Sequence, residues 1–365
     1  MTDNTNAAAS GDPQRSAWAA TAELYHAAFT GLILTVASRR GREDAGEWIK
    51  RVYRYQHHLK FKSSLAKLGI SEMPPAVLAA AYHYLSNGVG GVPVEFVRES
   101  DRKAWVRFVP PRWIYAGAAI CGVPTEVSRG MLEGWYTQNG PSLGNPRLGF
   151  VCTAQTMDGQ HGLSGYFLEY DRDLAPEERL VFRPGELMPP FDPAKAPRLP
   201  EQEWSPERLA KANRNYAIEY VRTGLPRLVE MFGPAEGGYL GRIALTQIGA
   251  QFWSQTKAGL GIEGEGPEAF GRFMAAISAA EDDPCEVWTE GGSTWVRRSS
   301  WRLARGVDHM PDAVFDAWNG LFEGALAVHD RFAVLEVHER IDRGDDSFLW
   351  RIRRRSGVSA PAAHI

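Results

Sequence analysis

Residues 93–97 (PVEFV) and 104–107 (AWVR) decide the fold. β-Branched and aromatic residues fill both arms, and the polar residues 99–102 separate them, so the segment is predicted to form a β-hairpin. Residues 284–288 (PCEVW) and 294–297 (TWVR) repeat this pattern across a Gly-Gly turn. The sequence therefore predicts the same hairpin twice.

The similarity between the two halves extends beyond the hairpin. Leu-Gly-Ile at 68–70 recurs at 260–262, and the offset between matched positions falls gradually from 192 to 185 residues along the chain. A slowly falling offset indicates a duplicated domain with small deletions, and so long a period favours two domain copies over a solenoid. The alternative is a pair of unrelated hairpins that share Trp-Val-Arg.

Periodic apolar residues predict the same order of elements in each half. In the first half we expect helices over about 16–38, 43–68, 74–87 and 125–138, the hairpin 93–109, and strands over about 147–156 and 164–170. In the second half we expect helices over about 206–231, 238–258, 267–280 and 311–327, the hairpin 284–299, and strands over about 331–341 and 347–354. The predicted fold class is α+β, a tandem duplication of a helical domain with a small antiparallel sheet, packed as a pseudo-dimer.

The chain is expected to divide into five parts. Residues 1–15 form a polar, disordered leader, 16–171 the first α+β repeat with the functional site, 172–203 a Pro-rich linker, 204–355 the second repeat, and 356–365 a tail. Seven prolines between 176 and 200 exclude a regular helix or a central strand from the linker. We expect it to lie on the surface as a semi-rigid strap.

The composition of the 365 residues is that of a globular protein with a net charge of −3. Because there is no basic surplus, we expect no nucleic-acid partner. The one basic run, 351–355, is expected to protect an edge strand. Three cysteines without a CxxC pattern, a polar N-terminus and the absence of an apolar run long enough for a bilayer predict a cytoplasmic protein that makes no membrane contact.

Polar residues that are present in only one half are candidates for function. His57 and His58 lie opposite Gly249 and Ala250, and the region that matches His83 contains no histidine. The first half has gained imidazoles where the second half keeps small residues. We therefore expect the site in the first half or at the junction of the halves.

Four residues are candidates for acid–base catalysis: His83, His161, Asp158 and His58. Imidazole suits this role because it titrates near neutral pH. Each candidate also has a plainer interpretation, His83 as a helix-end residue and Asp158 with His161 as a solvated hairpin tip. His57 and His58 are adjacent on a helix and point about 100° apart, so only one of the two can face a site.

Five residues are candidates for substrate binding: Arg107, Tyr84, Trp105, Trp113 and Trp135. Arg107 would hold a substrate carboxylate, and the aromatic side chains would wall the pocket. Arg107 is matched by Arg297 in the second half, so a cross-strand ion pair with Glu95 is the alternative role.

These residues predict a cofactor-independent enzyme, a lyase or a hydrolase, that acts on a small aromatic carboxylic substrate in the breakdown of aromatic compounds. The chain contains no nucleotide-binding, metalloprotease or serine-hydrolase motif, and we expect neither a cofactor nor a metal. The alternatives are a non-catalytic ligand-binding or sensor module with an apolar cavity, and a structural pseudo-dimer. The expected partner is the small-molecule substrate, and a homodimer is considered as well.

Residues 241–352 contain a set of features that are shared with one bacterial family. The features are the helix with Gly249, the hairpin segments 285–287 (CEV) and 295–297 (WVR), and the closing segments 344–345 (GD) and 350–352 (WRI). With these features, about a third of the chain resembles the L-2-amino-thiazoline-4-carboxylic acid hydrolase-like family. The family has cysteines after the hairpin, where Trp301 and Arg302 stand here, so no catalytic residue is carried over. The resemblance implies a bacterial cytosolic protein that handles a small molecule without a nucleotide cofactor.

Overall fold

The computed structural model describes residues 12–305 and 310–355. The chain forms two compact units, which we call unit 1 (Met1–Leu32 with Ala217–Ile365) and unit 2 (Ile33–Tyr216). Helix α1 (Pro13–Arg40) begins inside the segment that we expected to be a leader, because Pro13 suits the first turn of a helix. The rest of that segment, residues 1–11, and the tail 356–365 lie outside the described residues.

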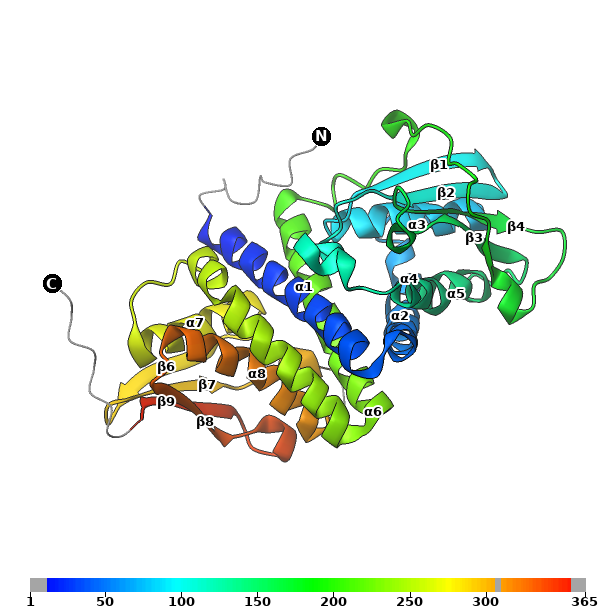
Figure 1. Cartoon of the computed structure of the whole chain (residues 1–365). Helices are drawn as coiled ribbons and strands as arrows, with labels where there is room; N and C mark the ends of the chain where they lie inside the picture. The colour runs from blue at the N-terminus through cyan, green and yellow to red at the C-terminus, as the bar shows by residue number, and fades with distance from the viewer. Residues whose placement is uncertain (1–11, 306–309, 356–365) are drawn as a thin grey trace. The chain divides into compact units, whose positions relative to one another are not determined.

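Unit 2 is an α+β structure, as the sequence predicts (Figure 1). Its helices are α2 (Arg42–Leu65), α3 (Pro75–Val89), α4 (Thr125–Met131), the π-helical turn η3 (Leu132–Tyr136) and α5 (Thr137–Ser142). Its strands are β1 (Val94–Ser100), β2 (Lys103–Phe108), β3 (Leu148–Ala154), β4 (Leu163–Glu169) and β5 (Leu180–Phe182), in the sheet order β1-β2-β4-β3-β5. Helix α3 packs on β1, β2 and β4, and the main core of the unit lies between them.

The segment that we expected to be a linker contributes to this sheet. Strand β5 pairs parallel with β3 through Val151 and Val181, and it lies at the edge, where flanking prolines are tolerated. Met188 and Val181 also pack against Trp105, Val151 and Tyr166 on the face of the sheet that α3 leaves open. The strap therefore covers one face and one edge of the sheet.

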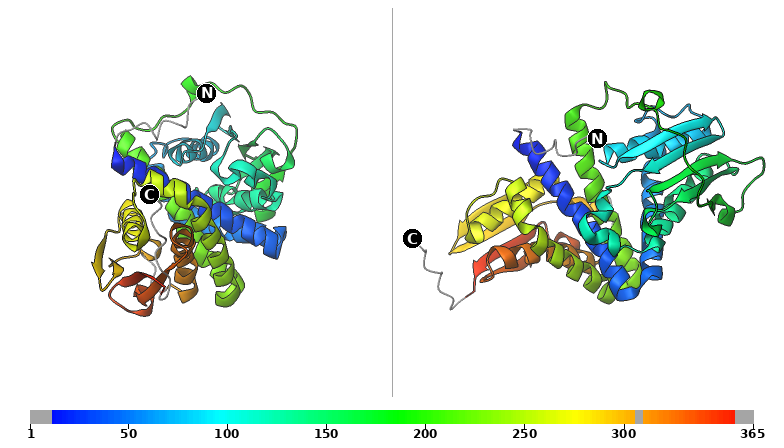
Figure 2. Two further views of the ribbon diagram at one scale, coloured as in Figure 1. Left: turned by 60° about the vertical axis from the view of Figure 1, so that its left-hand side comes forward. Right: turned by 45° about the horizontal axis from the view of Figure 1, so that its top comes forward.

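Unit 1 contains the second hairpin and a four-stranded antiparallel sheet (Figures 1 and 2). Its helices are α6 (Pro206–Gly259, of which residues from Ala217 belong here), α7 (Gly266–Ala280) and α8 (Asp312–His329), together with α1 up to Leu32. Its strands are β6 (Cys285–Glu290), β7 (Ser293–Arg298), β8 (Ala333–Glu339) and β9 (Phe348–Arg354), in the order β6-β7-β9-β8. Helix α6 is broken at Gly233, where φ is 82°, close to the expected gap between two helices.

One expectation for unit 1 is wrong. The basic run at 351–355 was expected to end an edge strand, but β9 pairs with β7 on one side and β8 on the other. Arg351 and Arg353 instead form ion pairs with Glu336 on β8, at 3.8 Å for Arg351. The positive charges of Arg351 and Arg353 therefore pair β9 with β8 within the sheet.

The two sheets share several local features. Glu95 pairs with Arg107 in one hairpin, and Glu286 pairs with Arg297 in the other. The register shifts after Cys152 on β3 and after Val337 on β8. These features agree with a tandem duplication, which stays a prediction, as does pseudo-dimer packing.

No helix among the described residues is both long enough and apolar enough to cross a membrane.

Candidate ligand-binding site

Three helical segments of unit 2 bring two histidines and an asparagine together in the interior. His57 lies on α2, His83 on α3 and Asn139 on α5, and all three side chains are buried. His57 Nε2 lies 3.1 Å from Asn139 Oδ1, and Asn139 Nδ2 lies 3.2 Å from His83 Nε2. One amide side chain therefore links the two imidazoles. We call these three residues the His–Asn–His cluster.

The amide fixes the tautomer of each imidazole. Because Asn139 Oδ1 can only accept, His57 must donate from Nε2, and its Nδ1 then carries the free lone pair. Because Asn139 Nδ2 can only donate, His83 must accept at Nε2 and carries its proton on Nδ1.

Aromatic rings enclose the cluster. His83 stacks on Tyr136 at a centroid distance of 4.0 Å and lies 5.6 Å from Phe167, and those two rings are themselves 5.5 Å apart. His57 stacks on Phe61 at 4.7 Å, and Trp135 meets the His57 ring edge to face at 5.4 Å. The site is therefore an aromatic-walled polar cluster inside the unit.

Burial keeps both imidazoles uncharged. The pKa of His83 is lowered well below its usual value, first by burial and then by the charges of His57 and Arg112. The pKa of His57 is lowered to about 4, mainly by burial, while the hydrogen bond to Asn139 acts in the opposite direction. At neutral pH both rings are hydrogen-bonding groups rather than cations.

Two buried nitrogen atoms at this cluster, His57 Nδ1 and Trp135 Nε1, make no hydrogen bond to the described residues. One carries a lone pair and the other a proton, so together they offer an acceptor and a donor. Native structures seldom leave such atoms unsatisfied, because an unmade buried hydrogen bond costs about 1–3 kcal/mol.

Trp135 owes its position to a local distortion of the helix. It lies in the π-helical turn η3, between α4 and α5. Gly134 allows this turn to approach α2 closely, since a Cβ at that position would lie 2.5 Å from the carbonyl oxygen of Lys50. Single π-helical turns are frequent at functional sites.

The structure brings together two of the sequence-predicted site residues, His83 and Trp135. His58 is exposed, and its neighbour His57 occupies the interior position instead. His57 follows Tyr53 by four residues and Ile49 by eight, and both of those are buried on α2. That helical spacing is the signal that selects His57 over His58.

The other predicted catalytic residues, Asp158 and His161, lie exposed at the hairpin tip. Asp158 accepts hydrogen bonds from Thr125 Oγ1 at 2.7 Å and from Gln155 Nε2 at 2.9 Å. Arg107 donates to His161 and forms an ion pair with Glu95 at 2.7 Å. The Arg107 contact is the cross-strand ion pair considered as its alternative role, and catalytic roles for Asp158 and His161 stay predictions.

The remaining predicted binding residues lie apart from the His–Asn–His cluster. Trp105 contacts Tyr166 on the opposite face of the sheet, and its Nε1 donates to Glu99 at 2.7 Å. Tyr84 contacts the rings of Phe96 and Phe191. Trp113 is partly buried against the main core.

Asn139 was not a candidate, because Asn139-Gly140 was interpreted as the end of a helix. The helix continues through Pro141 to Ser142. Within residues 12–305 and 310–355, no three His, Cys, Asp or Glu side chains are grouped so that they could hold a metal ion.

Comparison of the chain with known protein families, with curated proteins and with solved structures found no match. The family resemblance noted for residues 241–352 therefore stays a prediction.

Proposed function

We propose that unit 2 binds a small aromatic carboxylic acid beside His57 and Trp135, and that it takes up one proton with it. The observation that carries this proposal is the pair of buried, unsatisfied nitrogen atoms, His57 Nδ1 and Trp135 Nε1, within an aromatic wall. Each nitrogen would make a hydrogen bond of about 2.9 Å to a carboxyl oxygen. The surrounding rings suit an aromatic ligand.

A buried arginine acts on His83, the member of the cluster that does not contact the proposed ligand. Arg112 is buried, and its charge contributes to the lowered pKa of His83. The proposed carboxylate does not use Arg107, which is already paired with Glu95.

Proton uptake follows from the tautomer of His57. Its free Nδ1 lone pair repels a carboxylate unless the ring or the ligand carries a proton. Because the pKa of His57 is about 4, that proton must arrive with the ligand at neutral pH.

Access to His57 requires Trp135 to move. His57, His83, Asn139 and Tyr136 are all buried, whereas Trp135 is partly exposed. Its place in the π-helical turn gives it a backbone that differs from the regular helices on either side.

The test is calorimetric titration of the full chain with benzoate and with benzyl alcohol between pH 5.5 and 7.5. We expect benzoate to bind, and its apparent Kd to rise about tenfold per pH unit. His57→Gln should remove the pH dependence, and Trp135→Phe should weaken binding about fivefold through the lost N–H donor. His58→Gln is the matched control, since His58 is adjacent but exposed, and it should change neither. Benzoate that fails to bind, or His58→Gln with the effect of His57→Gln, would overturn the proposal.

A catalytic version of this site is the second candidate. Asn139 orients the His57 ring, and a general base is commonly oriented by such a supporting residue. This arrangement favours a cofactor-independent lyase or hydrolase. In that enzyme His57 would be the general base, in place of Asp158 and His161. Turnover of an aromatic acid that His57→Gln abolishes and His58→Gln preserves would support it. Binding without turnover across a panel of aromatic acids would leave the ligand-binding or sensor function.

The proposal also includes the expectations from the sequence. These are a bacterial, cytoplasmic protein that takes part in the breakdown of aromatic compounds, a small-molecule partner, and a homodimer as an option.

A further inference from the structure

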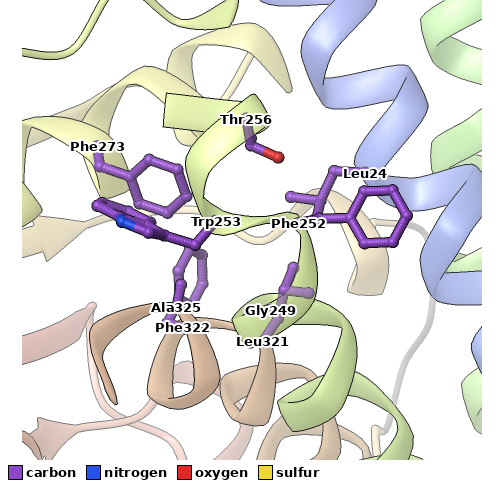
Figure 3. Close-up of a pocket in the computed structure, with 9 residues that line it drawn as sticks. All are labelled: Leu24, Gly249, Phe252, Trp253, Thr256, Phe273, Leu321, Phe322 and Ala325. Carbon is purple, nitrogen blue, oxygen red and sulfur yellow. The ribbon is translucent and has the colours of Figure 1, made fainter. Parts of the chain in front are cut away.

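Unit 1 contains an apolar crevice between helices α1, α6, α7 and α8 (Figure 3). Its walls include Leu24, Phe252, Trp253, Phe273 and Phe322. The crevice is closed by its own side chains and has no room for a water molecule. All of its lining residues are described, and none of them carries a charge.

The crevice contains one side-chain hydroxyl, that of Thr256. Thr256 is only 1% exposed, and its Oγ1 has no hydrogen-bond partner in the described part of the chain. Figure 3 shows the hydroxyl directed away from its own helix, toward the side on which Leu24 lies.

A threonine inside a helix ordinarily satisfies its hydroxyl by donating to the carbonyl four residues earlier. Thr223, on the segment of α6 before the break at Gly233, does so, and its Oγ1 donates to Glu219 O at 2.7 Å. Thr256 lies in the same kind of backbone but does not make this bond. Its hydroxyl is therefore available to a partner within the crevice.

We propose that this crevice binds a small, uncharged aromatic molecule that carries one hydroxyl or carbonyl group, with Thr256 as its polar anchor. The apolar and aromatic walls favour an aromatic body. The absence of a charged lining residue excludes an anion, whose desolvation would have no compensation. The ligand class therefore differs from the carboxylic acid proposed for unit 2.

The ligand must part the side chains in order to enter. Phe252 is partly exposed, whereas Leu24, Trp253 and Phe273 are buried, so the Phe252 ring is the group at the mouth that moves. Insertion of the ligand then replaces Phe252 contacts with ligand contacts and satisfies the Thr256 hydroxyl.

The test is ligand-observed NMR titration of the full chain with benzyl alcohol, toluene and benzoate. We expect benzyl alcohol and toluene to bind, and benzyl alcohol to bind about fivefold more tightly, the effect of one hydrogen bond. Thr256→Val keeps the shape and removes the hydroxyl, so it should abolish that preference, and Thr256→Ser should restore it.

Thr223→Val is the matched control, because that hydroxyl is already satisfied by its own helix. It should leave the fivefold preference unchanged, and so should His57→Gln in unit 2. If neither neutral ligand binds, or if Thr256→Val keeps the preference for benzyl alcohol, the inference is wrong. Benzoate binding that survives His57→Gln and is lost in Thr256→Val would also overturn it.

Discussion

The hydroxyl of Tyr25 donates a hydrogen bond to the buried carboxylate of Glu281, which lies 256 residues further along the chain. Trp318 Nε1 donates to the same hydroxyl at 3.3 Å, and Arg298 binds the other oxygen of Glu281 at 2.6 Å. This network joins α1 to α7 and α8 within unit 1. It explains why the start of the chain groups with the second half, although the sequence suggested that it belonged to the first repeat.

We expect Tyr25→Phe to lower the free energy of unfolding by about 1.5–3 kcal/mol, the usual effect of removing a hydrogen bond to a charged group. The pKa of Tyr25 is raised well above 10, first by burial and then by the charge of Glu281. A raised pKa stabilises the folded state below pH 10, and that stability is lost as the pH rises further. In urea unfolding, the free energy of unfolding of the wild type should therefore exceed that of the variant at pH 8, and this difference should become smaller above pH 10. If this difference stayed constant from pH 8 to above pH 10, the hydrogen bond from Tyr25 to Glu281 would be contradicted.

Asp283 is the acceptor at the centre of the neighbouring charge cluster. It is fully buried and accepts hydrogen bonds from Arg298 Nη2 at 2.6 Å, Ser300 Oγ at 2.7 Å and Arg305. We expect Asp283→Asn to lower the free energy of unfolding by about 3–5 kcal/mol, because it leaves the buried Arg298 with an incomplete set of partners.

The neighbouring Asp282 provides the control for Asp283→Asn. Its side chain is exposed and forms a surface ion pair with Arg302 at 3.1 Å, and its φ of 59° is one that asparagine adopts readily. Asp282→Asn should change stability by less than about 1 kcal/mol. If the two variants lowered the free energy of unfolding equally, in thermal or urea unfolding, the burial of Asp283 would not contribute to stability.

The His–Asn–His cluster predicts a specific sensitivity to acid. The folded-state pKa of His57 is about 4, against a usual value of 6.5, so the unfolded chain takes up a proton first as the pH falls. His57 therefore reduces stability progressively from pH 6.5 to pH 4, by about 1.4 kcal/mol per pH unit. In His57→Gln, unfolding free energies measured over this range should decline less steeply by that amount. His58→Gln should keep the wild-type slope, and a slope that is unchanged in His57→Gln would contradict the burial of this ring.

Gly134 permits the close approach of the π-helical turn to α2. Gly134→Ala would place a Cβ 2.5 Å from Lys50 O and 2.9 Å from the Cβ of Tyr53. We expect it to destabilise the protein by about 1–3 kcal/mol through overpacking, and to weaken ligand binding at His57.

Gly88→Ala is the contrasting change, since Gly88 lies in α3 and a Cβ there has no atom within 4 Å among the described residues. Alanine should stabilise that helix by about 0.5–1 kcal/mol. Thermal unfolding of both variants checks the pair, and destabilisation by Gly88→Ala would show that α3 is packed more tightly than the structure indicates.

The sequence predicts the elements well and the site only in part. Alternation and turn residues were sufficient for the hairpins at Glu95 and Glu286, because both signals are local. The π-helical turn before Asn139 was not predictable, because it depends on the contact of Gly134 with α2 rather than on local propensity. Asp158 and His161 appeared suitable for catalysis by residue type alone, and the hydrogen bonds that satisfy them come from Thr125 and Arg107.

The edges of the two sheets differ in a way that bears on self-association. In unit 2 the outer edge of β3 is occupied by β5, whereas the equivalent edge of β8 in unit 1 is not paired by any described residue. An open strand edge is a template on which the strand of another molecule can add. The register shift after Val337 interrupts that template. Strand-by-strand polymerisation would consequently start at the edge of β8 if this irregularity were removed, and the outer edge of β1 in unit 2 is likewise not paired by any described residue.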